Sequence, residues 1–355
     1  MNKKRIGGWK LVMISFMVIC FAVLVVAARG MRHETIRPCD IDITRIEHIN
    51  TERAGGSRVY FTTDVSSAGI LAAFNALGVT PTGNVAIKMH FGEVGNQNFL
   101  RPDYFRCLTA AVNGTWVDAN TIYDPASRPA DRILRRWATD IHLETARLHG
   151  FTFAPKDILD AGGEVRFPMN NPGGRSRYGE AVFGANIMNY DWIISVSNFK
   201  GHALAGFGGV FKNLAIGMAH PRGKWDIHVV NDGREAMWSR VGNDFLEMIV
   251  DYNKALFDIW PPGQMAFINV LSNIADSCDC FPNVRPPVMP DIGVLASLDP
   301  VALDKASVDM IFAHPHPGRM HVVNAILRTN GLHLLTYAEQ QGLGSQFYEL
   351  IRIDR

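Results

Sequence analysis

The sequence predicts an α/β fold: a mostly parallel sheet with helices on both faces, preceded by an N-terminal apolar signal or anchor helix. Three observations support this prediction. After residue 57, short apolar runs alternate with amphipathic segments, most of the runs are continuously apolar, and polar clusters directly follow several of them. Continuous apolar runs are typical of strands in a parallel sheet that is covered on both faces. Regular alternation of strands and helices is typical of α/β proteins.

The first 30 residues are predicted to be a signal peptide or signal anchor. Four basic residues precede an uncharged apolar run of 18 residues, Leu11–Ala28, which is typical of an export signal and long enough to span a membrane. Val26-Ala27-Ala28 would suit cleavage, so both a removed signal and a retained membrane anchor are open. The N-terminal positive charge places the rest of the chain outside the cytoplasm, in the periplasm, in the medium or at the cytoplasmic membrane.

The polar residues 31–57 are predicted to be a linker, and residues 58–355 a single α/β domain. The expected strands are Val59–Thr62, Val85–His90, Thr115–Ala119, Glu164–Pro168, Trp192–Ser197, Met265–Leu271 and Ile292–Ala296. The expected helices are Ser66–Leu77, Pro102–Val112, Arg128–His149, Asn243–Phe257, Pro300–Phe312 and Met320–Gly331. Ligands of open α/β sheets bind beyond the carboxyl ends of the strands, and polar clusters follow several of these strands.

Composition excludes some classes of protein. The 35 Lys and Arg residues nearly balance the 34 Asp and Glu residues, for a net charge of +1, and this argues against a nucleic-acid partner, which would need a basic excess on one face. Beyond the signal segment there are four cysteines, Cys39, Cys107, Cys278 and Cys280, too few for a disulfide scaffold. The oligomeric state cannot be read from the sequence.

The first polar cluster, Lys88–Asn96, contains His90 and Glu93 just after a predicted strand. A histidine and a glutamate three residues apart suit a metal site or an acid–base pair. In the alternative interpretation, the glycines of the cluster form a turn, and both side chains are solvated or bonded to it.

The second cluster is the richest in Gly, Lys and His. Apolar residues from Leu204 to Met218 fall at helical spacing, and glycines fall on a second stripe of the same helix. Glycine inside a helix costs roughly 1 kcal/mol relative to alanine, so a ligand or a second helix should pack there, or the segment is a loop. Nearby lysines and histidines suit an anionic ligand, although the spacing matches no phosphate-binding loop. Tight helix packing with solvated lysines is the alternative. The candidates are Lys200, His202 and Lys212 for chemistry and Gly206, Gly208, Gly209, Lys224 and His228 for cofactor binding.

The third cluster combines Cys278-Asp279-Cys280 with Asp299-Pro300 and Asp304. One residue between two cysteines cannot form the C-x-x-C hook of a structural zinc site, but such thiols can bind metal with distant histidines or react. Asp299 followed by proline indicates a helix N-cap. Asp304 falls near the first turn of that helix, where the helix dipole favours negative charge. The tentative metal ligands are Cys278, Cys280, His90 and His202.

Taken together, these stretches resemble the family catalogued as domain of unknown function 362. The resemblance rests on Lys88–Asn96, Asp118–Tyr123, His149–Phe151, Ser197–Asn213, Gly223-Lys224 with His228, Cys278–Cys280, Pro290–Gly293 and Asp299–Asp304, in family order. It implies an α/β domain, often described as an iron–sulfur-centre protein. No cysteine lies between Val229 and Ser277, where many relatives carry a ferredoxin insert, so a four-iron cluster of that type is not expected on ligand count.

Two functions are consistent with these patterns, and the cofactor is left open, with a metal ion as one possibility. The first is an exported or membrane-anchored enzyme, metal-assisted or redox, acting on a small anionic molecule. In it the lysines hold the anion, the histidines and Glu93 bind metal or move protons, and the thiols are ligands or redox groups; its catalytic candidates are His90, Glu93, Lys200, His202 and Lys212. The alternative is a non-catalytic extracytoplasmic protein that binds an anionic ligand on the same surface.

Overall fold

The computed structural model describes residues 55–123, 134–169, 175–230, 236–260, 263–282 and 285–354. The predicted signal or anchor helix and all but the end of the predicted linker lie outside these residues. Within this part of the chain, no helix is both long and apolar enough to cross a membrane.

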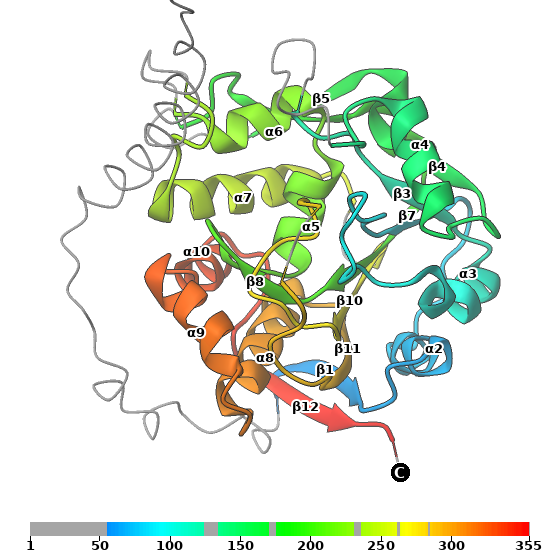
Figure 1. The fold of residues 1–355 in the computed structure, drawn as a ribbon, viewed down its shortest axis with the longest axis vertical. Coiled ribbons are helices and arrows are strands. Elements are labelled where there is room, and N and C mark those ends of the chain that lie inside the picture. Colours follow the sequence, from blue (N-terminus) through cyan, green and yellow to red (C-terminus); the bar gives the residue numbers. More distant parts are fainter. Residues whose placement is uncertain are drawn as a thin grey trace, which may run out of the picture. The chain divides into compact units, whose positions relative to one another are not determined.

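An eight-stranded sheet forms the centre of the described region (Figure 1). Along the sheet the strands are β12 (Tyr348–Arg352), β1 (Ser57–Thr62), β11 (Gly293–Ser297), β10 (Met265–Leu271), β7 (Trp192–Asn198), β2 (Val85–Lys88), β3 (Thr115–Asp118) and β4 (Lys156–Ile158). β11 runs antiparallel to β1 and β10, and the other neighbouring pairs are parallel. The mostly parallel sheet is therefore confirmed.

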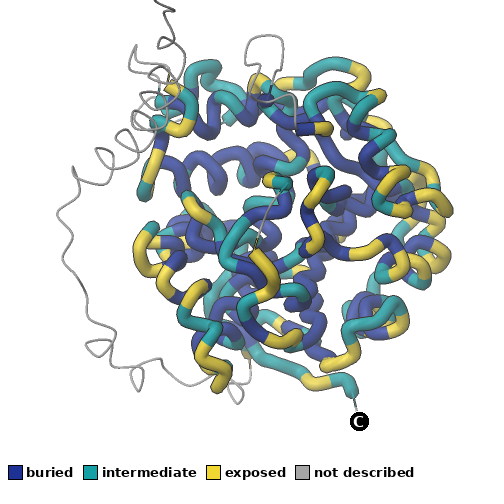
Figure 2. The backbone as a smooth tube through the Cα atoms, viewed as in Figure 1, coloured by how far each residue is buried: buried dark blue, intermediate teal, exposed yellow. Residues whose placement is uncertain are grey.

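Helices cover both faces of this sheet, as the sequence predicts. Alternate residues of a strand face opposite sides, and β10 shows the two sides clearly. Ile268 belongs to the apolar core that contains Ile70 and Phe74 of α2 (Ser67–Ala76). The next residue, Asn269, faces the other way and donates to Asp304 and Ser307 of α8 (Pro300–Ala313). The central strands are buried along their length (Figure 2).

The remaining helices agree with the prediction in most places. They are α3 (Arg106–Val112), α4 (Thr139–Leu148), α5 (Val210–Met218), α6 (Pro221–His228), α7 (Gly242–Phe257), α9 (Arg319–Arg328) and α10 (His333–Gln340), with short 3-10 turns at Pro102–Phe105, Leu159–Gly162 and Ala185–Asn189. The expected helix over 128–149 is too long within the described residues, because α4 begins only at Thr139. Arg136 precedes it, where its carbonyl accepts from the backbone N–H of Thr121 at 2.7 Å.

Two predictions about glycine-rich and strand segments need correction. Glu164–Pro168 forms β5, but it pairs only with β6 (Glu180–Gly184) in a separate two-stranded sheet. The helical pattern from residue 204 is partly wrong, since Lys200–His202 (β8) and Gly206–Gly208 (β9) form a hairpin and α5 begins at Val210. Gly206 needs its positive φ of 82°, a conformation that glycine adopts without strain.

The start of α5 is fixed by Asp304, which corrects the role expected for that residue. Its carboxylate accepts from the backbone N–H groups of Val210 at 2.9 Å and Phe211 at 3.3 Å, so it caps α5 instead of serving its own helix. Gly209 makes room for it, because a Cβ there would lie 2.2 Å from the carboxylate. Asp299 caps α8 as predicted, accepting from Ala302 N–H at 2.9 Å.

Candidate functional site

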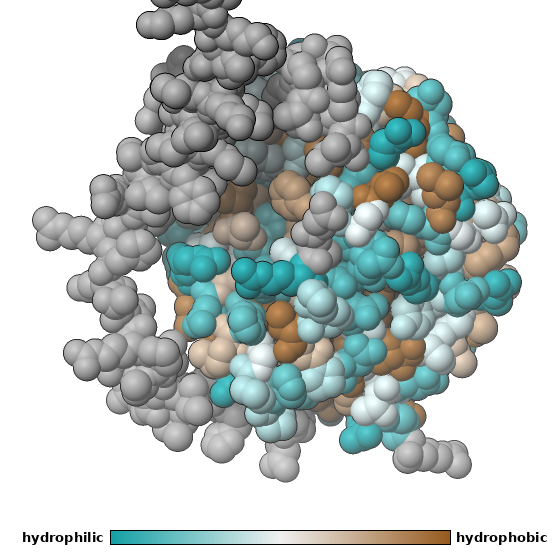
Figure 3. All heavy atoms as spheres, in the orientation of Figure 1, coloured by the Kyte–Doolittle hydropathy of each residue, from teal (hydrophilic) through white to brown (hydrophobic). Residues whose placement is uncertain are grey.

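A pocket lies beyond the carboxyl ends of three neighbouring parallel strands. His90 follows β2, Asn198 ends β7 and Cys278 follows β10, and all three line the pocket, which encloses about 520 Å³ of empty space, some of it open solvent. Its charged and reactive lining comprises His90, Lys200, His202, Lys212, Cys278 and Asp279. Hydrophilic side chains spread across the middle of the face shown in Figure 3, where Figure 1 places β8 and α5. Seven of the predicted site residues, these five and the glycines Gly208 and Gly209, therefore meet in one pocket with Asp279.

The two thiols of the site differ in charge. Cys278 is 8% exposed, and its sulfur lies 3.5 Å from Lys212 Nζ and accepts the backbone N–H of Cys280 at 3.3 Å. A hydrogen bond from the Cys280 thiol, helped by Lys212, lowers the pKa of Cys278 to about 5 against the effect of burial. The same hydrogen bond and burial raise the pKa of Cys280. These contacts therefore favour the thiolate form of Cys278 and the protonated form of Cys280.

Backbone contacts fix the proton of both pocket histidines on Nε2. The N–H of Gly92 donates to His90 Nδ1 at 2.9 Å, and the N–H of Ala205 donates to His202 Nδ1 at 3.0 Å. Each Nδ1 is an acceptor, so each neutral ring carries its hydrogen on Nε2. His90 Nε2 lies 3.8 Å from the sulfur of Cys280. Burial, with repulsion from Lys212, lowers the pKa of His202 to about 3, so this ring is a neutral hydrogen-bond donor.

The two predicted lysines have different roles. Lys200 is 3% exposed and pairs with the carboxylate of Asp279, which also accepts from Asn198 Nδ2 at 3.1 Å. Its charge is thus already matched, and it holds the turn between the two cysteines in place. Lys212 is more exposed, and its ammonium faces Cys278 from inside the pocket. Lys212 is therefore the better candidate for meeting an anion.

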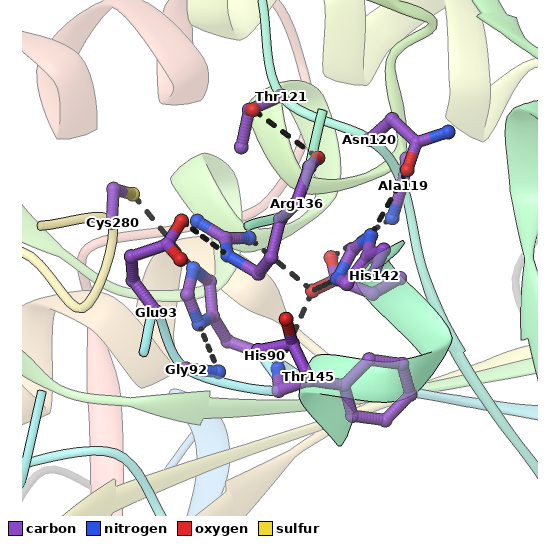
Figure 4. Close-up of polar contacts among 12 residues, drawn as sticks. His90, Gly92, Glu93, Ala119, Asn120, Thr121, Arg136, His142, Thr145 and Cys280 are labelled. Atoms are coloured by element: carbon purple, nitrogen blue, oxygen red, sulfur yellow. Dashed lines mark hydrogen bonds and ion pairs between the residues drawn. The ribbon is translucent and has the colours of Figure 1, made fainter. Parts of the chain in front are cut away.

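Behind the pocket lies a network of buried charges centred on Asp118. Figure 4 shows two of its members, Arg136 and His142. The Asp118 carboxylate lies 3.2 Å from Lys88 Nζ, 3.7 Å from Arg136 Nη1 and 3.5 Å from His142 Nε2. All of these side chains are at most 3% exposed. Burial alone would raise the pKa of Asp118, but the ammonium of Lys88 and the contact with His142 hold that pKa well below its usual range.

His90 and Glu93, predicted as a possible acid–base or metal pair, have different partners in the structure. Glu93 is fully buried; one carboxylate oxygen lies 3.4 Å from Arg136 Nε, and the other accepts from the backbone N–H of Arg135 at 2.8 Å. His90 faces Cys280 instead, as Figure 4 shows. Glu93 therefore anchors Arg136 beside the site.

The predicted cofactor residues are only partly brought together. Gly208 and Gly209 line the pocket, whereas a Cβ on Gly206 would lie 2.8 Å from Ile326 Cα of α9, so this glycine serves helix packing. Lys224 and His228 are buried in α6. Lys224 donates to the carbonyl of Ala219 at 2.6 Å, and burial lowers its pKa to about 8. His228 donates from Nδ1 to the carbonyl of Lys224 at 2.7 Å.

Sequence reasoning assigned no role to Lys88, Asp118, Arg136 or His142. A signal existed for the first two, because both are charged residues at the ends of apolar strands, and those strands prove to be parallel neighbours. Arg136 and His142 gave no such signal, since they come from the segment predicted as one long helix. In the described part of the chain, no three His, Cys, Asp or Glu side chains are grouped to hold a metal ion. The ligand set Cys278, Cys280, His90 and His202 stays a prediction.

Comparison with known proteins gave a family and several distant likenesses to solved structures. One solved structure is the lactate racemase apoprotein from Thermoanaerobacterium thermosaccharolyticum, with a TM-score of 0.34, 14% identity, and coverage of 60% of this chain and 50% of that one. Another is a structural-genomics protein from Thermotoga maritima, with a TM-score of 0.35, 9% identity, and coverage of 77% and 58%. The chain thus spans half the length of the first protein and somewhat more than half of the second.

A search of curated proteins found no match. The family match is more extensive, and it confirms the resemblance that the motifs indicate. The sequence profile described as "Domain of unknown function (DUF362)" matches residues 85–309, a range that contains the pocket, both thiols and the network around Asp118. Since this range is well over half of the sequence, the chain belongs to the DUF362 family.

Proposed function

We propose that the pocket is the active site of an enzyme that acts on a small anionic molecule, with the Cys278 thiolate as its nucleophile. The observation that supports this most is the position of the Cys278 sulfur. Cys278 lines the pocket, its sulfur lies 3.5 Å from Lys212 Nζ, and the sulfur accepts a hydrogen bond from the backbone N–H of Cys280. Reactive cysteines occupy such electropositive, partly accessible places, and an adjacent cation is a usual way of activating a thiol nucleophile.

The preference for an anion follows from the groups beside the thiolate. Lys212 supplies a positive charge inside the pocket, and the Nε2–H groups of His90 and His202 are hydrogen-bond donors. Hydrogen bonds between an anion and such donors are shorter and stronger than neutral ones. In this proposal Lys212, His90 and His202 contact the substrate, whereas Lys200 and Glu93 position the turn and Arg136.

We also propose that the enzyme works outside the cytoplasm, either exported or anchored at the membrane. The support is the basic start and apolar run within residues 1–30, which is typical of export signals. Intact mass of the protein from its native host would show whether that segment is retained. Elemental analysis of the same sample tests the metal-assisted version of the enzyme.

The proposal is tested by comparing two alkylating agents of similar size, the anionic iodoacetate and the uncharged iodoacetamide. Folded, reduced protein is treated with each, and modification is followed at Cys278 and at Cys107, a free, partly exposed thiol that serves as an internal reference. Because of Lys212, the rate ratio of iodoacetate to iodoacetamide should be at least about tenfold higher at Cys278 than at Cys107.

Two variants make the result specific. Lys212→Met should reduce the preference of Cys278 for iodoacetate. Lys254→Met removes a lysine of α7 that is paired with Asp258, and it should leave the preference unchanged. Equal ratios at Cys278 and Cys107 would contradict an anion-selective site. If Cys278 reacted with neither agent, the assignment of the nucleophile would be wrong.

A further inference from the structure

We propose that Cys278 and Cys280 form a dithiol–disulfide couple that exchanges two electrons with a small disulfide carrying carboxylate groups. This inference rests on the proposed function, because it uses Cys278 as the attacking group. It goes further in giving Cys280 a chemical role, in naming the substrate class and in making the reaction a reduction of the substrate.

The turn that carries the two cysteines is fixed in place by the contacts of Asp279, the residue between them. Asp279, between them, pairs with Lys200 and accepts from Asn198 Nδ2 at 3.1 Å. Its carbonyl accepts from the backbone N–H of Glu93 at 3.2 Å. Next to Asp279, the backbone N–H of Cys280 donates to the Cys278 sulfur at 3.3 Å, and the Cys280 thiol is itself hydrogen-bonded to Cys278. The short loop therefore keeps both thiols within reach of one reacting sulfur.

Each thiol also has its own supporting group. Lys212 faces the Cys278 sulfur, and His90 Nε2 lies 3.8 Å from the Cys280 sulfur. The His90 hydrogen is fixed on Nε2 by the Gly92 contact, so the ring can donate to a Cys280 thiolate once it forms. A thiolate that attacks and a neighbouring thiol that resolves are the two parts that disulfide exchange needs.

The reaction balances with a disulfide R–S–S–R as co-reactant. The Cys278 thiolate attacks one sulfur; a new S–S bond forms, the bond in the substrate breaks, and one thiolate leaves with the electron pair and takes up a proton. Cys280 then loses its proton to water and attacks the Cys278 sulfur, and the second substrate thiolate leaves and is protonated. The protein dithiol is oxidised by two electrons, and the substrate disulfide is reduced to two thiols.

The position of Lys212 on the pocket wall indicates that the substrate carries negative charge. A carboxylate next to the reacting disulfide would lie near the Lys212 ammonium, which faces Cys278 inside the pocket, while Lys200 is already paired with Asp279. A neutral disulfide of similar reactivity gains nothing from that charge. We therefore expect the pocket to distinguish disulfides by charge and not only by size.

The test uses the reduced full-length protein and two probe disulfides, anionic oxidised glutathione and neutral hydroxyethyl disulfide, with peptide-level mass spectrometry. Wild-type protein should give a peptide containing Cys278 and Cys280 that has lost two hydrogen atoms and carries no probe. Cys280→Ser should instead retain a mixed disulfide on Cys278. Cys278→Ser should label Cys280 at least about tenfold more slowly than wild type labels Cys278, because the resolving thiol is the weaker attacker.

Cys107→Ser is the matched control and should behave as wild type; peptide mapping separates any reaction at Cys20 or Cys39. Circular dichroism checks that each variant is folded, and the wild-type peptide alone decides the outcome if one is not. A mixed disulfide that persists in wild type, or a preference for the neutral probe, overturns this inference. If iodoacetate nevertheless modifies Cys278 selectively, the proposed function stands without it; if Cys278 is inert to all probes, both fail.

Discussion

The pocket wall and the network behind it use similar residues in opposite ways. On the wall, the Cys278 thiolate has one cation, Lys212, and both side chains line open space. Behind it, Asp118 contacts Lys88, Arg136 and His142, and the whole group is almost completely buried. Charged groups that already have ion-pair partners inside the protein bind a ligand weakly, whereas an accessible ion pair can exchange one partner for a ligand. We therefore assign the chemistry to the wall and the stability to the network.

The largest effect that would test this comparison is the removal of the central charge of the network. Asp118→Asn leaves the buried Lys88 ammonium without its carboxylate, and breaking a buried ion pair from one side costs about 3–5 kcal/mol. Urea unfolding should show a loss of that size. Glu144→Gln breaks an exposed pair with Arg147 and should change the unfolding midpoint very little. Equal effects of the two variants would remove the distinction between the regions.

A second buried carboxyl group sharpens the comparison. Asp304 is as buried as Asp118, but within the described residues its hydrogen bonds come from uncharged groups, namely Asn269 and the N–H groups of Val210 and Phe211. Burial raises the pKa of Asp304 to about 6. At a pH below the pKa of Asp304 in the unfolded protein, this carboxyl group is protonated in both the folded and the unfolded protein. Between roughly pH 4 and 6 it is protonated in the folded protein and ionised in the unfolded protein. Stability should therefore fall as pH rises through this window.

The free energy of unfolding should fall by about 3 kcal/mol across this pH window, because the pKa of Asp304 is about two higher in the folded protein than in the unfolded one. Asp304→Asn removes the titrating group, so the stability difference between wild type and variant, measured by urea unfolding at several pH values, isolates it. The Asp118 contribution has the opposite sign: its pKa is lowered, so its stabilisation is complete above about pH 4 and is lost as pH falls. A difference between wild type and Asp304→Asn that does not vary with pH would contradict the expectation for Asp304.

On the wall, the expected effect is smaller and concerns reactivity. Because the pKa of Cys278 is lowered to about 5, its alkylation rate should be half-maximal near that pH and constant at neutral pH. Lys212→Met removes a stabilising cation and should move the profile upward by about one pH unit. The exposed-lysine variant Lys254→Met should not move it. A profile that Lys212→Met leaves in place would mean that the N–H and thiol of Cys280 alone stabilise the thiolate.

The smallest effect is expected from His90, which supports the second thiol. His90→Leu removes the imidazole N–H next to Cys280 and puts no other donor in its place. The loss of one hydrogen bond should slow closure of the Cys278–Cys280 disulfide about threefold to tenfold. Initial attack by Cys278, measured in the same quenched time course, should slow less than closure does, because Lys212 and His202 still contact the substrate. If both steps slowed equally, His90 would act on the pocket as a whole and not on Cys280.

Local patterns in the sequence predicted most of the fold. The strands predicted to begin at Val59, Val85, Thr115, Trp192 and Met265 are present in the structure. They could be predicted because a buried parallel strand has a continuous apolar sequence. Errors arose where a distant contact decides the local structure. The region around 204–218 reads as one helix by spacing, yet Asp304, 94 residues away from Val210, sets where α5 begins.

That several candidate site residues lie together could be expected for the same reason, whereas their roles stay predictions. His90, Lys200, His202, Lys212 and Cys278 follow strands or lie in one glycine-rich segment, so their convergence could be expected from topology. That Lys200 is neutralised by Asp279, and that Arg136 lies behind the thiols, depends on side-chain contacts between segments far apart in sequence. Such contacts leave no periodic pattern in one sequence.

The position of β1 has a consequence for how the chain is made. This strand is the first one in the described residues, and it pairs with β11 and β12, which begin at Gly293 and Tyr348. During synthesis, neither neighbour exists until the chain has been made as far as those two residues. The apolar strand β1 therefore has two open edges while the segments between are synthesised, and unpaired edges invite association with other chains. Closure of the sheet at β1 is consequently late relative to the synthesis of β1, and this edge is the part of the sheet that stays open longest.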